Sequence, residues 1–291
     1  MIACSRICMG TLALMMLAVP TAAGGNGALR ALPASEIAFS CNGDICMMRD
    51  DGSRLVRLTF DRWIDDYPAW SPDGRTIAFT GVVRNDVLFT INPAGGDRRR
   101  LTNGRAGGSL PAWSPDGRAI AFDDTATGSV FVSDALGNGR HSVLAAPSAS
   151  PAWSPDGTRL AYVASDGRRL ALTSGELFVA AADGRNSRRL VRNASFPAWS
   201  PSGTGIAFAR NVGGTDAEIW VVAADGAYKR RVVAHSAQGG GISWSPDGLR
   251  LAYVRDGDIY TVGPFGGGVQ RLTHGHGDNL NPAWRPCCSR R

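Results

Sequence analysis

The chain of 291 residues has few cysteines and histidines, and it has no long hydrophobic run after its N-terminal region. None of its six cysteines lies in a Cys-x-x-Cys pair, which argues against a structural zinc site. Its four histidines are not accompanied by a Gly-x-Ser-x-Gly nucleophile elbow, so no Ser-His-Asp triad can be assigned. No later segment approaches the roughly 20 apolar residues that a transmembrane helix needs. These absences favour a soluble protein that is not an enzyme.

The first 23 residues have the features of a secretory signal peptide. Arg6 supplies a short positive region, and an apolar stretch of 13 residues runs from Ile7 to Val19. Small residues precede a cleavage site after Ala23. An uncleaved membrane anchor is the alternative, but the stretch is short for a bilayer. We predict a signal peptide over residues 1–23, a short linker over 24–34, and a secreted or periplasmic location.

Export changes how the cysteines are counted. Cys4 and Cys8 lie in the predicted signal peptide and are removed with it. Four cysteines remain that can form disulfides, with three possible connectivities: Cys41, Cys46, Cys287 and Cys288. A two-residue turn after Cys41 places Asp44, not Cys46, opposite it in the hairpin. This register does not favour a local bond between Cys41 and Cys46.

Tryptophan recurs six times just before a short turn sequence, at Trp70, Trp113, Trp153, Trp199, Trp244 and Trp284. The intervals are 43, 40, 46, 45 and 40 residues, which is the range of propeller blades. An Ile/Leu-Ala-Phe/Tyr triplet follows the first five. The repetition predicts an all-β protein whose blades form a ring.

Each repeat is interpreted as four short strands. Pro-Ala-Trp forms the first strand, and a Ser-Pro-Asp-Gly turn leads to the second, in which a small residue between two large ones indicates burial on both faces. The turn aspartates are interpreted as structural rather than as a calcium array: Asp73, Asp116, Asp156 and Asp247. Because each tryptophan adjoins an alanine or serine in a buried strand, we expect it to pack between blades rather than to stack on sugars.

The first blade has no Pro-Ala-Trp strand of its own, because its first element is the triplet Ile37-Ala38-Phe39. The strand that it lacks is found at the other end of the chain, at Pro282-Ala283-Trp284. We therefore predict a six-bladed β-propeller over residues 35–286, closed by a C-terminal strand that completes the N-terminal blade. Residues 287–291 are left as a tail.

The repeated Pro-Ala-Trp-Ser-Pro-Asp-Gly-x-x-Ile-Ala-Phe motif, with later Asp-Gly and Leu-Thr elements, resembles that of the TolB-type, WD40-like β-propeller family. The resemblance covers roughly residues 35–286. It implies a bacterial envelope protein whose propeller binds other proteins. TolB also carries an N-terminal domain that this sequence does not show, so its role in the Tol-Pal system is not carried over.

The blade-to-blade loops are longer and more individual than the turns at the other end of the blades, so we expect binding on the face that carries them. Candidate binding residues in these loops are Asp61, Asp65, Asp66, His235, His274, His276 and Asp278. Imidazole and carboxylate groups could hold a divalent cation, and the weak metal candidates are His235, His274 and His276. We expect no cofactor.

The net charge of +6 comes with several arginine clusters, including residues 98–100 and 188–189. Three of the four clusters precede the outermost strand of a blade, where charge protects an exposed sheet edge from pairing. We therefore expect no nucleic-acid partner.

Two functions remain open. The first is an exported, monomeric scaffold module that binds a protein or cell-envelope partner through its loops. The alternative is a secreted propeller that binds or cleaves glycans, as a lyase or hydrolase, with a His/Asp metal site.

Overall fold

The computed structural model describes residues 35–103, 107–145, 147–164, 175–214, 216–237, 240–275 and 277–286. The chain divides into two compact units, residues 1–33 and 34–291, and every described residue belongs to the second. The predicted signal peptide and linker, His276 and the tail cysteines Cys287 and Cys288 lie outside the described residues.

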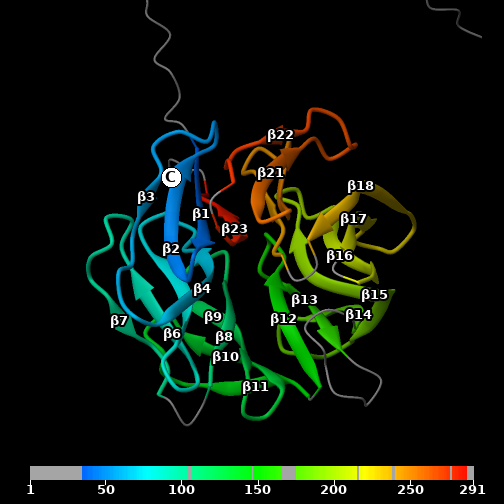
Figure 1. Cartoon of the computed structure of the whole chain (residues 1–291). Helices are drawn as coiled ribbons and strands as arrows, with labels where there is room; N and C mark the ends of the chain where they lie inside the picture. Colours follow the sequence, from blue (N-terminus) through cyan, green and yellow to red (C-terminus); the bar gives the residue numbers. More distant parts are fainter. Residues whose placement is uncertain are drawn as a thin grey trace, which may run out of the picture. The chain divides into compact units, whose positions relative to one another are not determined.

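The described residues form strands and no helix, in agreement with the predicted all-β class (Figure 1). The strand pairing gives four sheets of four strands and one sheet of seven. The first sheet contains β23 (Asn279–Trp284), β1 (Glu36–Cys41), β2 (Asp44–Arg49) and β3 (Val56–Arg57). The second contains β4 (Ile64–Trp70), β5 (Ile77–Val82), β6 (Asp86–Ile91) and β7 (Arg99–Arg100). The third contains β8 (Ser109–Trp113), β9 (Ala119–Asp124), β10 (Ser129–Asp134) and β11 (His141–Leu144).

The seven-stranded sheet consists of two blades that share one long strand. It contains β12 (Ser148–Trp153), β13 (Arg159–Ala164), β14 (Gly175–Ala181), β15 (Arg188–Trp199), β16 (Gly205–Gly213), β17 (Asp216–Ala223) and β18 (Lys229–Ala237). The start of β15 pairs with β14 and its end pairs with β16, so β15 is the outer strand of one blade and the inner strand of the next. The last sheet contains β19 (Ser243–Trp244), β20 (Leu251–Arg255), β21 (Asp258–Val262) and β22 (Gln270–Arg271).

The two ends of the described chain meet in the first blade. Strand β23 runs antiparallel to β1, with Trp284 opposite Ile37 and Ala283 opposite Ala38, and Figure 1 shows the two strands side by side in red and blue. Beyond the pair, the Arg285 amide donates to the carbonyl of Glu36 at 2.7 Å. These contacts confirm the pairing that the missing Pro-Ala-Trp strand predicts.

The inner strands contact one another in a cyclic order. Strand β23 contacts β4, and contacts follow between β4 and β8, β8 and β12, β12 and β15, β15 and β19, and β19 and β23. The second strand of every blade is packed between neighbouring sheets, as Ile77, Ala78 and Phe79 show by their complete burial. This arrangement is that of a β-propeller.

The Ser-Pro-Asp-Gly turns use their aspartates locally, as predicted. Ser71 Oγ donates to Asp73 at 2.6 Å, and Ser154 Oγ donates to Asp156 at 2.5 Å. The same aspartates accept backbone amides two residues later. The hydrogen bond from Ser154 lowers the pKa of Asp156 to about 2. These carboxylates stay ionised and close their own turns.

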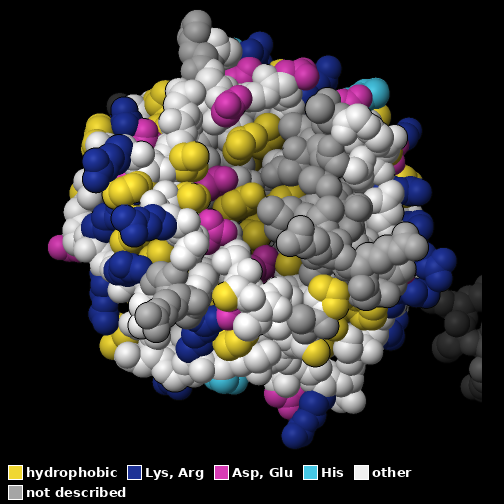
Figure 2. All heavy atoms as spheres, turned by 60° about the horizontal axis from the view of Figure 1, so that its bottom comes forward, with side chains coloured by type: hydrophobic (Ala, Val, Ile, Leu, Met, Phe, Trp, Pro, Cys, Tyr) yellow, Lys and Arg dark blue, Asp and Glu magenta, His cyan; other side chains and the backbone are white. Residues whose placement is uncertain are grey.

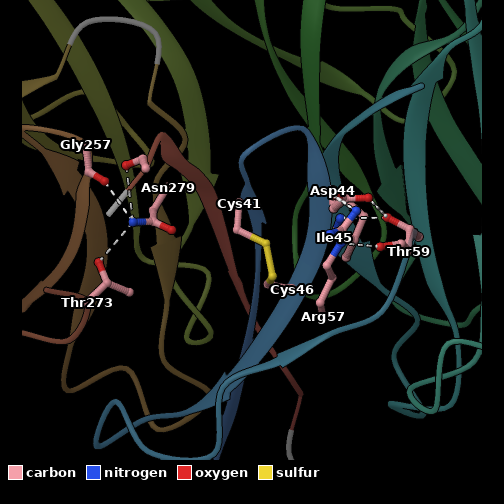
Figure 3. Close-up of a disulfide and its surroundings, with 10 residues drawn as sticks. Cys41, Asp44, Ile45, Cys46, Arg57, Thr59, Gly257, Thr273 and Asn279 are labelled. Carbon is pink, nitrogen blue, oxygen red and sulfur yellow. Dashed lines mark hydrogen bonds and ion pairs between the residues drawn. A yellow bond between two sulfur atoms is a disulfide. The ribbon is translucent and has the colours of Figure 1, made fainter. Parts of the chain in front are cut away.

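The prediction for the hairpin cysteines was wrong: Cys41 and Cys46 form a disulfide, with their Cα atoms 5.9 Å apart (Figure 3). The expected register is present, since Cys41 lies opposite Asp44 and Phe39 lies opposite Cys46. Cys41 and Cys46 are therefore diagonal neighbours on one face of the hairpin. The right-handed twist of a two-stranded ribbon brings such diagonal positions together, and an argument from directly opposed pairs misses this.

Removing the end of β23 should open the ring. We expect a chain that ends at Asn281 to unfold at a lower temperature than a chain that ends at Pro286, and to self-associate, because Ile37 and Ala38 of β1 then lose their partners. Thermal unfolding and the sedimentation of both chains check this. An unchanged melting temperature and a monomeric truncated chain would contradict it.

The disulfide should contribute about 2 kcal/mol to the free energy of unfolding, because it closes a short loop in the unfolded chain. Urea denaturation of the chain with Cys41→Ser and Cys46→Ser should show a loss of this size. Reductant should reproduce the loss in the parent protein and leave the double variant unchanged. Equal stabilities of parent and double variant would contradict the expectation.

Candidate binding face

Five of the six inner strands carry a left-handed residue directly before the proline of Pro-Ala-Trp. The positive φ angles belong to Tyr67 (52°), Leu110 (51°), Ser150 (54°), Phe196 (49°) and Asn281 (53°). At the same point in each strand the pairing register shifts, as in a β-bulge. Such a backbone conformation costs on the order of 1 kcal/mol for a residue other than glycine. Bulges re-aim side chains, and all five residues line the cavity at the centre of the ring.

Side chains of neighbouring positions accept the backbone N–H groups at these bulges. Thr80 Oγ1 accepts the amide of Leu110 at 3.2 Å, and Asp123 Oδ1 accepts the amide of Ser150 at 2.8 Å. In both cases the acceptor comes from the preceding blade. The bulges are therefore joined to one another across the blade boundaries.

The central cavity has a volume of about 270 Å³ and is lined by residues of all six inner strands. Tyr67 and Phe196 stack there, with ring centroids 6.4 Å apart and an angle of 17° between the ring planes. They belong to β4 and β15, which lie three steps apart in the cyclic order of six inner strands. An aromatic pair therefore bridges the centre of the ring.

Three carboxyl groups surround Tyr67. Burial raises the pKa of its phenol, and the nearby Asp66, Asp86 and Asp123 raise it further. Asp123 is only 6% exposed, burial raises its pKa well above the usual range, and its Oδ2 has no hydrogen-bond partner among the described residues. Burial, and then the charge of Asp66, raises the pKa of Asp86. Carboxyl groups therefore gather at the centre of this face, which we call the acidic centre, although burial disfavours the charged form of Asp86 and Asp123.

Asp66 connects the first and second blades. Its Oδ1 accepts the amide of Tyr67 and the Nδ2 of Asn281, both at 2.7 Å, and the hydroxyl of Ser40. Asn281 in turn accepts the amide of Gly241 at 2.8 Å. The C-terminal strand thus helps to fix the groups at the centre of the ring.

Figure 2 views the end of the blades that carries the blade-to-blade connections, here called the loop face. Acidic side chains lie among hydrophobic ones near its middle, and most Lys and Arg side chains lie toward its rim (Figure 2). The opposite end, which carries the Ser-Pro-Asp-Gly turns, is called the turn face.

Asp61 and Asp65, both predicted binding residues, are joined by one arginine. Arg98 contacts Asp65 at 3.3 Å and also pairs with Asp61, and its guanidinium lies over the ring of Phe89. The side chain of Asp65 is fully buried, and burial raises its pKa to about 6 although Arg98 opposes the change. Asp65 therefore stabilises the start of β4 from within the protein, and of the two aspartates Asp61 is the one that remains partly accessible.

The histidine sector predicted from the sequence is only partly described. His235, His274 and Asp278 are exposed, and His276 lies outside the described residues. Among the side chains that can be placed, no group of three or more His, Cys, Asp or Glu residues is arranged to hold a metal ion. The metal site remains a prediction from the sequence.

Two of the blade-to-blade connections are formed by extended strands rather than by the long loops that the sequence analysis expects. Residues 192–196 lie within β15, so no loop separates the fourth and fifth blades. His235 likewise lies in β18, which continues to Ala237. The reason is that an outer strand can pass directly into the next inner strand when its backbone keeps an extended conformation.

An exposed hydrophobic patch lies in the connection before β4, and the sequence analysis missed it. Phe60 is 73% exposed and Ile64 is 58% exposed, with half-buried Trp63 between them. Asp61 holds this segment, because its Oδ1 accepts the amide of Trp63 at 2.8 Å. The sequence feature that could have revealed the patch is a Phe-x-x-Trp-Ile run in a segment already assigned to a loop. We call Phe60, Trp63 and Ile64 the loop patch.

The strand order and the cyclic contacts define the class of protein as a β-propeller. The family model for the TolB beta propeller domain matches residues 34–193 and 126–290, and the chain belongs to this family. A search of the curated proteins finds no match. Among the described residues, no helix has the length and apolar character needed to cross a membrane.

Solved structures show the same fold. The chain is similar to TolB from Acinetobacter baumannii at 18% identity, over 87% of this chain and 67% of that one, with a TM-score of 0.76. A putative TolB from Agrobacterium tumefaciens is 21% identical over 82% of this chain and 88% of its own, with a TM-score of 0.65. A chain of a nidogen–laminin complex is 12% identical over 87% of this chain and 100% of its own, with a TM-score of 0.71. At these identities the likeness establishes the fold alone.

Asp65 should make stability depend on pH. Its pKa in the folded protein is about 6 instead of 3.8, so folding favours the protonated form. Stability contributed by this group is therefore fully present below about pH 4 and is lost as the pH rises to about 6. We expect Asp65→Asn to remove this dependence.

Urea denaturation of parent and Asp65→Asn at pH 4 and pH 7 tests the expectation. The stability of the variant relative to the parent should increase from pH 4 to pH 7. A difference that is constant with pH, or that changes in the opposite direction, would show that the buried carboxyl is not the responsible group.

Proposed function

We propose that this protein is an exported binding module that holds a protein partner on its loop face. The observation that carries the proposal is the loop patch, in which exposed apolar side chains are held in place beside the acidic centre of the ring. Exposed hydrophobic groups that are rimmed by polar residues are typical of interaction sites.

The loop patch is fixed before any partner binds. Arg57 lies over the ring of Phe60 at 4.9 Å, and Arg62 lies over the ring of Trp63 at 4.8 Å. Asp61 and Arg98 hold the connecting backbone from below. A segment that is already ordered loses less conformational entropy on binding, which favours affinity.

The acidic centre suits a partner with basic residues. Asp66 and Asp86 are half-buried, so both can face a bound molecule. Opposite charge across an interface increases the association rate and selects between partners more than it increases affinity. A partner surface with an apolar group for the loop patch and a basic group for the centre fits this face.

Export is supported by the covalent chemistry of the chain. The bond between Cys41 and Cys46 is typical of a protein in an oxidising compartment. Together with the signal-like leader, it favours a secreted or periplasmic location.

Replacing residues of the loop patch should weaken partner binding. Residues 24–291 serve as bait in an extract of the envelope of the producing cells, and each captured protein is then purified and titrated against the bait. We expect the bait that carries Phe60→Ser and Ile64→Ser to bind the captured protein at least about tenfold more weakly than the parent bait does, because central apolar contacts dominate interface energies.

The matched control is Leu249→Ser with Phe265→Ser on the turn face. These side chains are also strongly exposed, and Phe265 is likewise covered by an arginine, Arg230. The control should bind as the parent does. Equal binding by the loop-patch variant and the parent would overturn the proposal.

A further inference from the structure

Arginine covers three of the six repeated tryptophans on the turn face. The guanidinium of Arg159 lies 4.7 Å from the ring centroid of Trp199, and that of Arg250 lies 4.9 Å from that of Trp284. Both arginines directly precede the Ile/Leu-Ala-Phe/Tyr triplet of the preceding blade.

The first blade provides the same cover in a different way. The position before its triplet is Glu36, which pairs with Arg285, and Arg285 lies 5.0 Å from the ring centroid of Trp70. The three covered tryptophans are buried: Trp70 is 6% exposed, Trp199 8% and Trp284 5%.

The other three blades have a short residue at the covering position. It is Thr76 in the second blade, Ala119 in the third and Gly205 in the fifth. The tryptophan of the following blade is half-buried in every case: Trp113, Trp153 and Trp244. These three tryptophans still pack against buried core residues, as expected, but the residue at the covering position is too short to cover them as arginine covers the others.

Trp113 borders a cleft between the second and third blades. The cleft has a volume of about 810 Å³, which is within the range of ligand sites. Its polar lining includes Asp73, Arg75, Thr76, Thr90, Arg99 and Asp116. An aromatic side chain is thus surrounded by both hydrogen-bond donors and acceptors.

This lining fits the chemistry of a sugar. A pyranose ring has an apolar face of C–H groups that can stack on an indole, while each hydroxyl can both donate and accept a hydrogen bond. Arginine offers only donors and ionised aspartate offers only acceptors, so the two together match a set of hydroxyls. The two arginines and two aspartates balance in charge, which favours a neutral ligand.

We propose that this cleft on the turn face binds a neutral saccharide, with one pyranose ring stacked on Trp113 and its hydroxyls bonded to the arginine and aspartate side chains. The proposal goes beyond partner binding on the loop face. A proline-rich peptide fits less well, because such segments dock between several aromatic side chains, and Trp113 is the one aromatic residue of the described lining.

The structure supplies its own blocking variant, Thr76→Arg, which installs the cover found at positions 159 and 250. The backbone at this position is the same in covered and uncovered blades. The amide of Thr76 donates to Ser71 Oγ at 2.9 Å, and the amide of Arg159 donates to Ser154 Oγ at 2.9 Å. The variant should therefore fold and melt as the parent does, while the new arginine occupies the face of Trp113.

The probes are hexasaccharides of α-1,4-linked glucose, β-1,4-linked glucose and β-1,4-linked N-acetylglucosamine, titrated into residues 24–291 by calorimetry and tryptophan fluorescence. We expect at least one to bind the parent and to bind Thr76→Arg at least about tenfold more weakly. The matched control Ala119→Arg covers Trp153 instead and should keep the parent affinity.

Three outcomes would overturn the proposal: no hexasaccharide binds, Thr76→Arg binds as the parent does, or only Ala119→Arg loses binding. Tighter binding of a polyproline decapeptide than of any sugar would also overturn it. The loop-patch variant should retain saccharide binding, so failure of the loop-face function and failure of this site are distinguishable.

Discussion

The pairing of β23 with β1 is the interaction on which the rest of the structure depends. It places residues from the two ends of the propeller in one blade, with Trp284 opposite Ile37. It also brings Asn281 to Asp66 at the centre of the ring and places Arg285 over Trp70 on the turn face. Both faces are therefore built partly by the last strand, although the residues that we expect to bind ligands lie elsewhere in the sequence.

The two faces follow different physical rules. On the loop face, bulges and left-handed residues direct side chains to the axis, where burial raises the pKa of Asp86 and of Asp123 near Tyr67. On the turn face, repeated turns fix the backbone, and a single variable position decides whether a tryptophan is covered. A propeller can change one face without disturbing the other, because each blade keeps the same buried strands between them.

Much of the fold could be predicted from the sequence, because the repeated motif fixes the strands and their burial. The position of the last strand followed from counting Pro-Ala-Trp strands against triplets. The disulfide between Cys41 and Cys46 did not follow, since a register describes opposed pairs and not the twist that brings diagonal pairs together. The direct crossing inside β15 was missed because nothing in residues 192–196 distinguishes an extended crossing from a loop.

The candidate site was harder to predict. Asp65 and Asp66 are adjacent in the sequence, yet the pleat directs one to Arg98 and the other to the ring centre. Phe60 and Ile64 were overlooked because only the charged residues of their connection were considered as binding candidates. The uncovered face of Trp113 could have been found by comparing Thr76 with Arg159, a difference visible in the sequence.

Hydrogen exchange of the backbone amides in residues 24–291 tests the central claim most directly. If the pairing of β23 with β1 holds the ring, the amide of Arg285, which donates to the carbonyl of Glu36, should exchange as slowly as those of the buried second strands, through the same global opening. Fast exchange of β23 while the other inner strands stay protected would contradict the account, because the ring would then stand without its last strand.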